Sequence, residues 1–268
     1  MRQLLRSAWS TLRFIQAYTI ANVQAALEYR LAFASQVFVM LANDCLWLFY
    51  WWTYFQQFPL THGWQLTDIV ILWSVSACAF GLGDAIFGNA RQLVPLIMNG
   101  GLDAYLGMPR NVLLHASIAS THPTAWGDIL FAIIVYLVFL HPDPFHVVIY
   151  LLLVLLGACI FTAFSIILCS LAFFLGNTEG LVEQTFGALV SFSTYPMDIF
   201  HGVVKLLLFT VLPAGFISFI PLQLLHRFTW PLLGAMFGVT ILFVLAASTL
   251  FNFGLRRYES GNLLGMQN

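Results

Sequence analysis

Long runs of apolar residues dominate the chain, with short polar or proline-containing breaks between them. A membrane-spanning helix needs about 20 mostly apolar residues, because the hydrocarbon core of a bilayer is about 30 Å thick. In the third of the predicted spans, residues 112–140, we expect the helix to kink or begin at Pro123, because the proline ring removes a backbone N–H donor. The six predicted spans cover residues 31–55, 68–87, 112–140, 146–175, 181–195 and 229–254.

The stretch between the last two predicted spans, residues 196–228, is apolar enough to enter a membrane but carries three prolines. These are Pro196, Pro213 and Pro221, and the first directly follows Tyr195. Because a proline inside a helix clashes with the preceding turn, one straight span is not expected here. We predict re-entrant short helices on the outer side of the membrane, and two additional spans are the alternative.

The first 29 residues do not form a span, because arginines are spread along them. Apolar residues such as Trp9 recur at spacings of three and four positions, whereas Arg6 and Arg13 fall on other faces of the same helix. This pattern is typical of a helix that lies along a membrane surface. We therefore divide the chain into an interfacial helix at 1–29 and a single six-helix transmembrane domain at 30–268.

The composition of the chain also indicates a membrane protein. Of the 268 residues, 60% are hydrophobic and only 8% are charged, whereas a soluble globular protein carries about 25% charged residues. This excludes an ordinary soluble enzyme and a disordered chain, and the formal net charge of −1 offers no basic surface for a nucleic acid. The sequence predicts an all-α membrane protein with six transmembrane helices, since each helix satisfies its own backbone in lipid.

Basic residues predict the orientation of the spans. Eight arginines fall on the side that holds both termini, and only Lys205 and Arg227 fall on the other side. Lysine and arginine accumulate on the cytoplasmic side of a membrane. We therefore expect both termini in the cytoplasm.

Acidic residues inside the predicted spans are the main candidates for chemistry, since an acid at the centre of a spanning helix costs about 2.5–3.5 kcal/mol. Asn43 and Asp44 lie near the middle of the first span, Trp47 begins the aromatic cluster that ends it, and Asp84 lies toward the cytoplasmic end of the second. These four residues are candidates for lining a transport pathway. For Asp44, a counter-charge or ion relay and an interhelical hydrogen bond both remain open, whereas the structural role is favoured for Asp84 and for Asp128 in the third span.

No catalytic or metal-binding motif accompanies these acids. The four cysteines and seven histidines show no spacing typical of metal ligands, so we predict no metal site. A phosphate-binding loop needs Gly-Lys-Ser/Thr, yet the only lysine, Lys205, follows two valines. We expect the chain to bind no cofactor and not to hydrolyse ATP by itself.

The loop between the second and third predicted spans, residues 99–110, is expected to form a short amphipathic helix. Leu102, Tyr105 and Leu106 are expected on one face of it. Such a helix either anchors the loop at the membrane or is gripped by a cytoplasmic partner. The candidate docking residues are Gly101, Leu102, Asp103, Tyr105, Leu106, Pro109 and Arg110.

Short motifs along the chain resemble, in order, those of the permease family of ABC-2-type exporters. The motifs are Gly100-Gly101-Leu102-Asp103 leading to Met108-Pro109-Arg110, Tyr195-Pro196 with Phe200 downstream, Leu212-Pro213-Ala214-Gly215-Phe216-Ile217 leading to Ile220-Pro221, and Arg257-Tyr258-Glu259-Ser260-Gly261. The resemblance covers nearly the whole chain. It implies that the N-terminal helix and the 99–110 loop dock on a separate ATPase subunit, which binds ATP and Mg²⁺. It also implies that 200–221 is re-entrant, and that two permease chains, identical or related, enclose the pathway.

The leading hypothesis is therefore the membrane permease of an ATP-driven ABC exporter in the bacterial cytoplasmic (inner) membrane, which moves a small or amphipathic substrate. One alternative is an ion-coupled secondary carrier that uses Asp44. Another is a non-transporting membrane scaffold or an intramembrane enzyme. The identity of the substrate is not encoded in any motif that we found.

Overall fold

The computed structural model describes residues 2–58 and 63–258, with the side chains of the first helix described from Trp9 onward. Within these residues the chain is helical and contains no strand, which confirms the all-α class. The long helices are α1 (Arg2–Glu28), α2 (Arg30–Gln57), α3 (Leu66–Phe87), α7 (Pro123–Leu140), α8 (Pro144–Ser170), α10 (Glu179–Ser193) and α13 (Trp230–Leu255). The shorter segments are η1 (Gly88–Gln92), α4 (Leu93–Met98), α5 (Asp103–Leu106), α6 (Val112–Ile118), α9 (Ala172–Leu175), η2 (Met197–Ile199), α11 (Val203–Thr210), η3 (Gly215–Phe219) and α12 (Ile220–His226).

Five stretches of helix are long and apolar enough to cross a membrane. They are α2, α3 continued through α4, α7, α8 continued through α9, and α13. They correspond to the first, second, third, fourth and sixth predicted spans. The fifth predicted span is α10, which has only 15 residues and is about 22 Å long at 1.5 Å per residue. Because the hydrocarbon core is about 30 Å thick, α10 does not cross it alone.

The third predicted span is divided at its proline. Pro123 occupies the first turn of α7, where its missing N–H is not needed. Residues 119–122, of which His122 is extended, are not helical and separate α7 from the short α6. The part of this region that is long and apolar enough to cross a membrane is therefore α7. Of the two possibilities expected at Pro123, a kink or a helix start, the structure shows the helix start.

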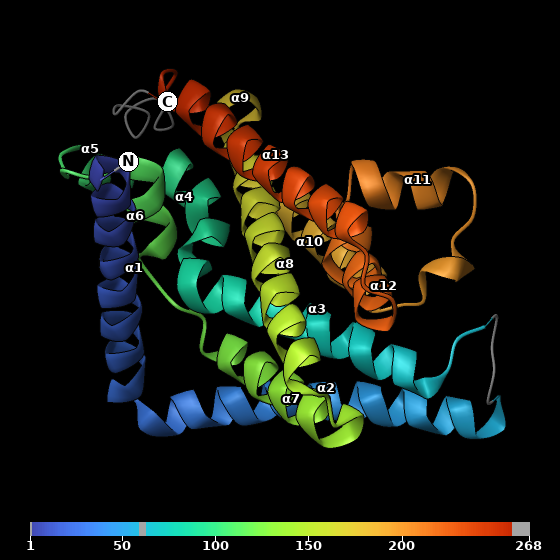
Figure 1. The fold of residues 1–268 in the computed structure, drawn as a ribbon. Helices are drawn as coiled ribbons and strands as arrows, with labels where there is room; N and C mark the ends of the chain where they lie inside the picture. The colour runs from blue at the N-terminus through green and yellow to red at the C-terminus, as the bar shows by residue number, and fades with distance from the viewer. Residues whose placement is uncertain (1, 59–62, 259–268) are drawn as a thin grey trace.

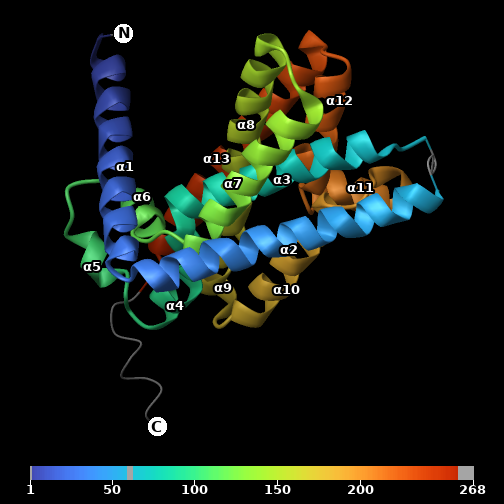
Figure 2. The same ribbon diagram turned by 90° about the horizontal axis from the view of Figure 1, so that it is seen from below.

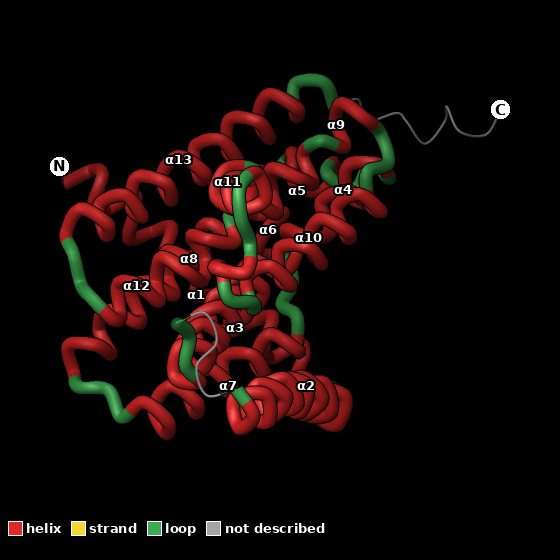
Figure 3. The backbone as a smooth tube through the Cα atoms, turned by 90° about the vertical axis from the view of Figure 1, so that its right-hand side faces the viewer, coloured by secondary structure: helices red, strands yellow, loops and turns green. Residues whose placement is uncertain are grey.

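The proline-rich segment 196–228 forms short helices, as its prolines predicted. The run α11 and the run η3–α12 are bent by 76° relative to one another at a short break that contains Pro213. Pro221 lies in the first turn of α12, and Pro196 directly precedes η2. Together the pair is apolar enough to be a broken span or a re-entrant loop; the re-entrant path stays a prediction. Figure 3 shows α11 and α12 in a view along the axis of α2.

The N-terminal helix α1 does not run with the bundle. It crosses the direction of α2 in both Figure 1 and Figure 2. Only Tyr29 separates the two helices. The short segments α4 and α5 lie at the same end of the molecule as α1, and α11 lies at the opposite end (Figure 1). This arrangement is the one that a helix lying along a membrane surface would require; the surface location itself stays a prediction.

Two glycines bring α2, α3 and α7 unusually close together. A Cβ at Gly127 in α7 would lie 2.6 Å from the carbonyl oxygen of Val37 in α2. A Cβ at Gly81 in α3 would lie 2.8 Å from the carbonyl oxygen of Ala125 in α7. Small residues are common where membrane helices pack with their backbones nearly touching. The consequence for function is that polar side chains on the three helices share one space.

Buried side chains form two apolar clusters that meet along α3. One surrounds its N-terminal half and includes residues up to Cys78. The other surrounds its C-terminal turns, from Ala79 onward, and also packs against α4, α8 and α10. The polar cavity described next lies beside the place where the two clusters meet.

Candidate functional site

A cavity of about 600 Å³ lies among α2, α3, α7, α8 and α10. All four residues predicted to line a pathway, Asn43, Asp44, Trp47 and Asp84, lie on its wall. Its other charged or polar lining residues are Arg91, Thr124, Asp128, Glu183, Ser191 and Thr194. Five helices thus contribute to one polar space inside an apolar bundle.

Asp44 is the least exposed of the cavity acids. It is 3% exposed, although most of α2 is exposed. Its carboxyl interacts with that of Asp128, which is half-buried on α7. One carboxyl oxygen of Asp44, Oδ2, is buried and has no hydrogen-bond partner among the residues that the structure describes. A buried polar atom without a partner is costly, and this one belongs to a residue on the cavity wall.

Aromatic side chains form the walls beside the two acids. Trp47 stacks on Trp73, with ring centroids 6.0 Å apart. The indole N–H of Trp73 donates to the carbonyl oxygen of Thr194 at 3.0 Å, which fixes the ring. Phe161 lies 4.9 Å from Phe80, centroid to centroid, on another part of the same wall. The cavity wall that carries the two acids therefore also carries apolar aromatic surface.

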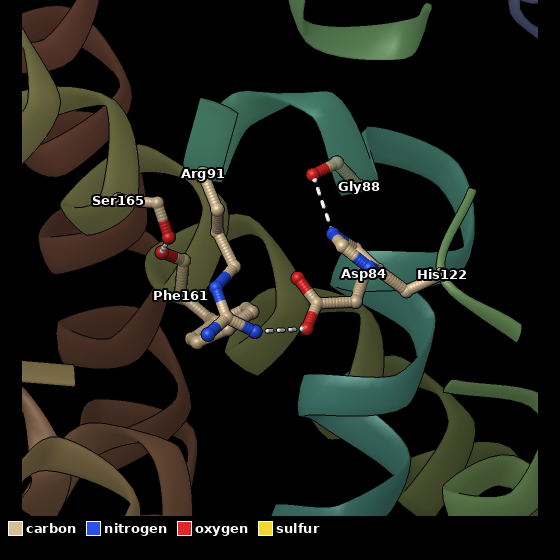
Figure 4. Close-up of polar contacts among 6 residues, drawn as sticks. All are labelled: Asp84, Gly88, Arg91, His122, Phe161 and Ser165. Carbon is tan, nitrogen blue, oxygen red and sulfur yellow. Dashed lines mark hydrogen bonds and ion pairs between the residues drawn. The ribbon is translucent and has the colours of Figure 1, made fainter. Parts of the chain in front are cut away.

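One end of the cavity is crossed by an ion pair. The 3-10 segment η1 turns the chain at the end of α3, so that an Arg91 Nη1 lies 3.1 Å from Asp84 Oδ2 (Figure 4). The ring of His122 holds this turn, since its Nε2 bonds the carbonyl oxygen of Gly88 at 3.0 Å (Figure 4). The backbone N–H of His122 also donates to the carbonyl oxygen of Asp84 at 3.2 Å.

Beyond Arg91 lies a second cavity of about 260 Å³. Arg91, Glu183 and Phe186 line both cavities, and the Arg91 guanidinium lies over the Phe186 ring at 4.9 Å. The second cavity also includes Glu179, on the first turn of α10. The three shared side chains are therefore the partition between the two spaces.

The predicted docking loop is tied to α1 rather than standing free. The guanidinium of Arg110 donates to the hydroxyl groups of Ser10 and Thr11 at 3.3 Å and lies 5.0 Å from the Phe14 ring centroid. Further along, the Asn22 side chain donates to the carbonyl oxygen of Ile118 at 2.8 Å. We call α1 together with residues 99–118 the platform.

His115 lies at the centre of the platform. Its Nδ1 is 3.3 Å from the Tyr18 hydroxyl, and its ring packs edge-on against Phe14. Burial, with a smaller contribution from the positive charge of Arg110, lowers the pKa of His115 below its ordinary value. Burial likewise raises the pKa of Tyr105, on the neighbouring α5. The surroundings of His115 in the platform therefore favour the neutral form of its imidazole.

The loop residues do not share a face in the way that the sequence predicted. Leu102 is fully buried and Tyr105 is half-buried against the bundle, whereas Leu106 is 47% exposed. The physical reason is that α5 has only four residues, with Leu102 at its N-terminal boundary, so helical periodicity does not extend over all three side chains. The exposed residues of the loop are Asn99, Asp103, Ala104, Leu106, Gly107, Met108 and Pro109, and Gly100, Gly101 and Arg110 are partly exposed.

The remaining predicted site residues lie at the two ends of the molecule. On α1, Trp9 is exposed and the Arg13 guanidinium lies 5.1 Å from its ring centroid; the Arg6 side chain falls outside the described residues, as do Glu259, Ser260 and Gly261. At the opposite end Tyr195 packs edge-on against Trp51 and also lines the 600 Å³ cavity. Pro196 and Pro221 are buried near it, and Pro213 is buried at the bend.

Sequence reasoning missed the roles of Asp128, Arg91, Glu183 and Trp73. Asp128 was visible as an acid inside a span, but its partner Asp44 lies on another helix. Arg91 and Glu183 fall near predicted span ends, where a charge needs no special explanation. For Asp44 and Asp128, the signal that could have related them is the pair of glycines, Gly81 and Gly127, that lets α2, α3 and α7 approach closely. Among the described residues, no group of three or more His, Cys, Asp or Glu is placed to hold a metal ion.

A bundle of candidate spanning helices around a polar cavity, with a helical platform at one end, is the architecture of an integral membrane protein. The chain belongs to the ABC-2 family of transporter proteins, because the model of that family, described as "ABC-2 family transporter protein", matches residues 41–262. Neither the curated proteins nor the solved structures gave a match.

Proposed function

We propose that this chain is the membrane subunit of an ATP-driven exporter, which moves a small or amphipathic substrate with energy from a separate ATPase. The observation that carries the proposal is the platform. A loop pinned to a helix that crosses the bundle direction is a rigid surface through which another subunit can move the spans. Family membership supports the transport role, and the 600 Å³ cavity supplies a place for a substrate.

In this proposal ATP and Mg²⁺ bind to the partner subunit and not to this chain. The only lysine, Lys205, lies 3.1 Å from Asp198 in an ion pair on the segment between α10 and α13. It therefore has a structural partner, and no Gly-Lys-Ser/Thr loop exists elsewhere in the sequence. Closure of an ATPase dimer on ATP would move two platforms toward each other and bias the bundle between two arrangements.

The proposal includes a second permease chain, either a copy of this one or a related chain, and a lipid bilayer around both. It places the protein in the bacterial cytoplasmic membrane with both termini in the cytoplasm, on the platform side. The excess of arginine on that side supports this orientation. A fluorescent protein fused to the C-terminus should be fluorescent in cells, whereas an alkaline phosphatase fused there should be inactive; the reverse pair of results would contradict the orientation.

Co-expression with a candidate ABC ATPase subunit, sought in the neighbouring reading frames, tests the proposal. We expect the ATPase to co-purify with the full chain, and proteoliposomes containing both to show ATPase activity that depends on the permease. Leu106→Asp places a charge on the exposed part of the loop and should weaken this dependence. The matched control is Leu181→Asp, an exposed leucine on α10 away from the platform.

An imposed ion gradient separates the proposal from a secondary carrier that uses Asp44. Substrate movement that needs ATP and ignores the gradient supports the exporter. Movement driven by the gradient in vesicles without the ATPase would overturn it in favour of the carrier. An ATPase that neither binds the chain nor responds to it would overturn the proposed coupling as well.

A further inference from the structure

We propose that the 600 Å³ cavity binds an organic cation with an aromatic or apolar body, and that Asp44 and Asp128 supply its counter-charge. This inference rests on the proposed function only in taking the cavity as part of a transport route; the binding itself needs no ATPase. It names the substrate class by charge, size and surface. The argument uses three independent features of the cavity: its charge balance, an unpaired oxygen, and its aromatic walls.

The charge balance of the cavity is negative. Four carboxyl groups and one guanidinium line it, an excess of three acids over bases. The guanidinium of Arg91 is engaged by Asp84 at 3.1 Å, which leaves the other three acids without a basic partner on the cavity wall. Neighbouring carboxyls commonly share one proton, and even then the Asp44 and Asp128 pair keeps one negative charge. In a low-dielectric bundle a positive ligand is attracted strongly and an anion is repelled.

The unpaired oxygen gives that charge a location. Asp44 is 3% exposed, lies on the cavity wall, and carries the buried Oδ2 that has no partner among the described residues. Charged side chains inside a membrane bundle are normally paired with one another or with a backbone group. A cationic ligand would supply the missing partner, which a neutral or anionic ligand would not do as well.

The aromatic walls of the cavity favour a ligand with an aromatic or apolar body. Trp47 and Trp73 stack on each other in the cavity wall, and Phe80, Phe161 and Phe186 form a second aromatic group in the same wall. Aromatic faces attract cations and bury apolar groups. A volume of about 600 Å³ is in the range for drug-sized molecules. A bare metal ion would instead need several oxygen ligands converging at about 2.0–2.6 Å, and no such group occurs among the described residues.

Tetraphenylphosphonium is a suitable probe, because tetraphenylborate has nearly the same shape and the opposite charge. We would measure equilibrium binding of tetraphenylphosphonium to the purified full chain in nanodiscs of zwitterionic lipid, with empty nanodiscs as the blank. Quenching of tryptophan fluorescence provides a second readout, since two tryptophans line the cavity. We expect saturable binding to the protein that tetraphenylborate does not displace.

Charge-removing and charge-keeping variants then locate the site. Asp44→Asn and Asp128→Asn each remove a carboxylate with little change in shape, and each should weaken binding by about tenfold or more. Asp44→Glu keeps the charge and should stay within about threefold of the wild type. The control, Asp143→Asn, also removes one acid, but at the exposed turn before α8, where Asn can still cap the helix; it should bind normally.

Three results would overturn the inference: no saturable binding, equal displacement by tetraphenylborate, or equal affinity in Asp44→Asn and Asp143→Asn. A thermal melt of each variant shows whether it is folded, and Asp128→Asn provides a second test if Asp44→Asn is not. A complex that couples ATP hydrolysis to this chain but binds no cation would contradict the cation site and leave the proposed function standing. Cation binding without any coupled ATPase would instead sink the proposed function alone.

Discussion

Gly127→Ala is a demanding test of how the bundle brings its acids together. The added Cβ would lie 2.6 Å from the carbonyl oxygen of Val37 and 2.8 Å from the Cβ of Met40. Neither neighbour is the end of a flexible side chain, so α2 and α7 must separate. Overpacking of this kind costs about 1–3 kcal/mol, and each kcal/mol lowers the unfolding temperature of a chain of this size by about 2–4 °C. We expect a decrease of roughly 2–12 °C.

Thiol labelling during a thermal ramp measures this effect. Cys78 and Cys169 are buried and become reactive when the bundle opens, whereas Cys45 is exposed and sets the baseline. Gly238→Ala is the matched control, because a Cβ at that helical glycine meets nothing within 4 Å. Gly238→Ala should leave the unfolding temperature unchanged or raise it slightly, since alanine is the better helix former. An unfolding temperature for Gly127→Ala equal to that of Gly238→Ala would refute the close-packing argument.

The remaining predictions concern the platform and the ion pair at the cavity end. Arg110→Ala removes the contacts of the loop with α1 and should reduce permease-dependent ATPase activity, whereas Arg110→Lys should retain part of it; equal activity in both would contradict the role of the guanidinium. Asp84→Asn removes the carboxylate that pairs with Arg91 and should lower the unfolding temperature by a small amount, and an unchanged melt would show that the ion pair is not stabilising. Because folding lowers the pKa of His115, its contribution to stability is intact above the ordinary histidine pKa of about 6.5 and is lost as the pH falls through the lower folded value. Circular dichroism melts should show that acid-induced loss, and a profile in His115→Gln as steep as that of the wild type would contradict it.

The spanning helices could be predicted from the sequence because apolar length is a local property. Pro123 and Pro213 also act locally, and both mark breaks in the observed helices. The loop was harder: Leu102 and Leu106 were assigned to one face, yet α5 has four residues and packs Leu102 inward. Periodicity is informative only where a helix is long enough to display it.

The cavity could be predicted only in part. Asp44 was identifiable because an acid in mid-span needs a reason, and its place on the cavity wall agrees with that reasoning. Its relation to Asp128 was not identifiable, since 84 positions separate the two residues and no local pattern connects them. What brings them together is the absence of a side chain at Gly127, and an absence of this kind is read from packing rather than from hydrophobicity.

The helices α1 and α2 run in different directions and are joined by a single residue. Because Tyr29 alone links them, a movement of α1 is passed to α2 through one residue. The close contact at Gly127 then serves as the fulcrum, seven positions before Asp44 at Val37. A small rotation of the platform would swing the Asp44 carboxyl relative to Asp128. If another subunit moves the platform as proposed, Tyr29 and the close contact at Gly127 are therefore the two points through which that movement reaches the Asp44 carboxyl.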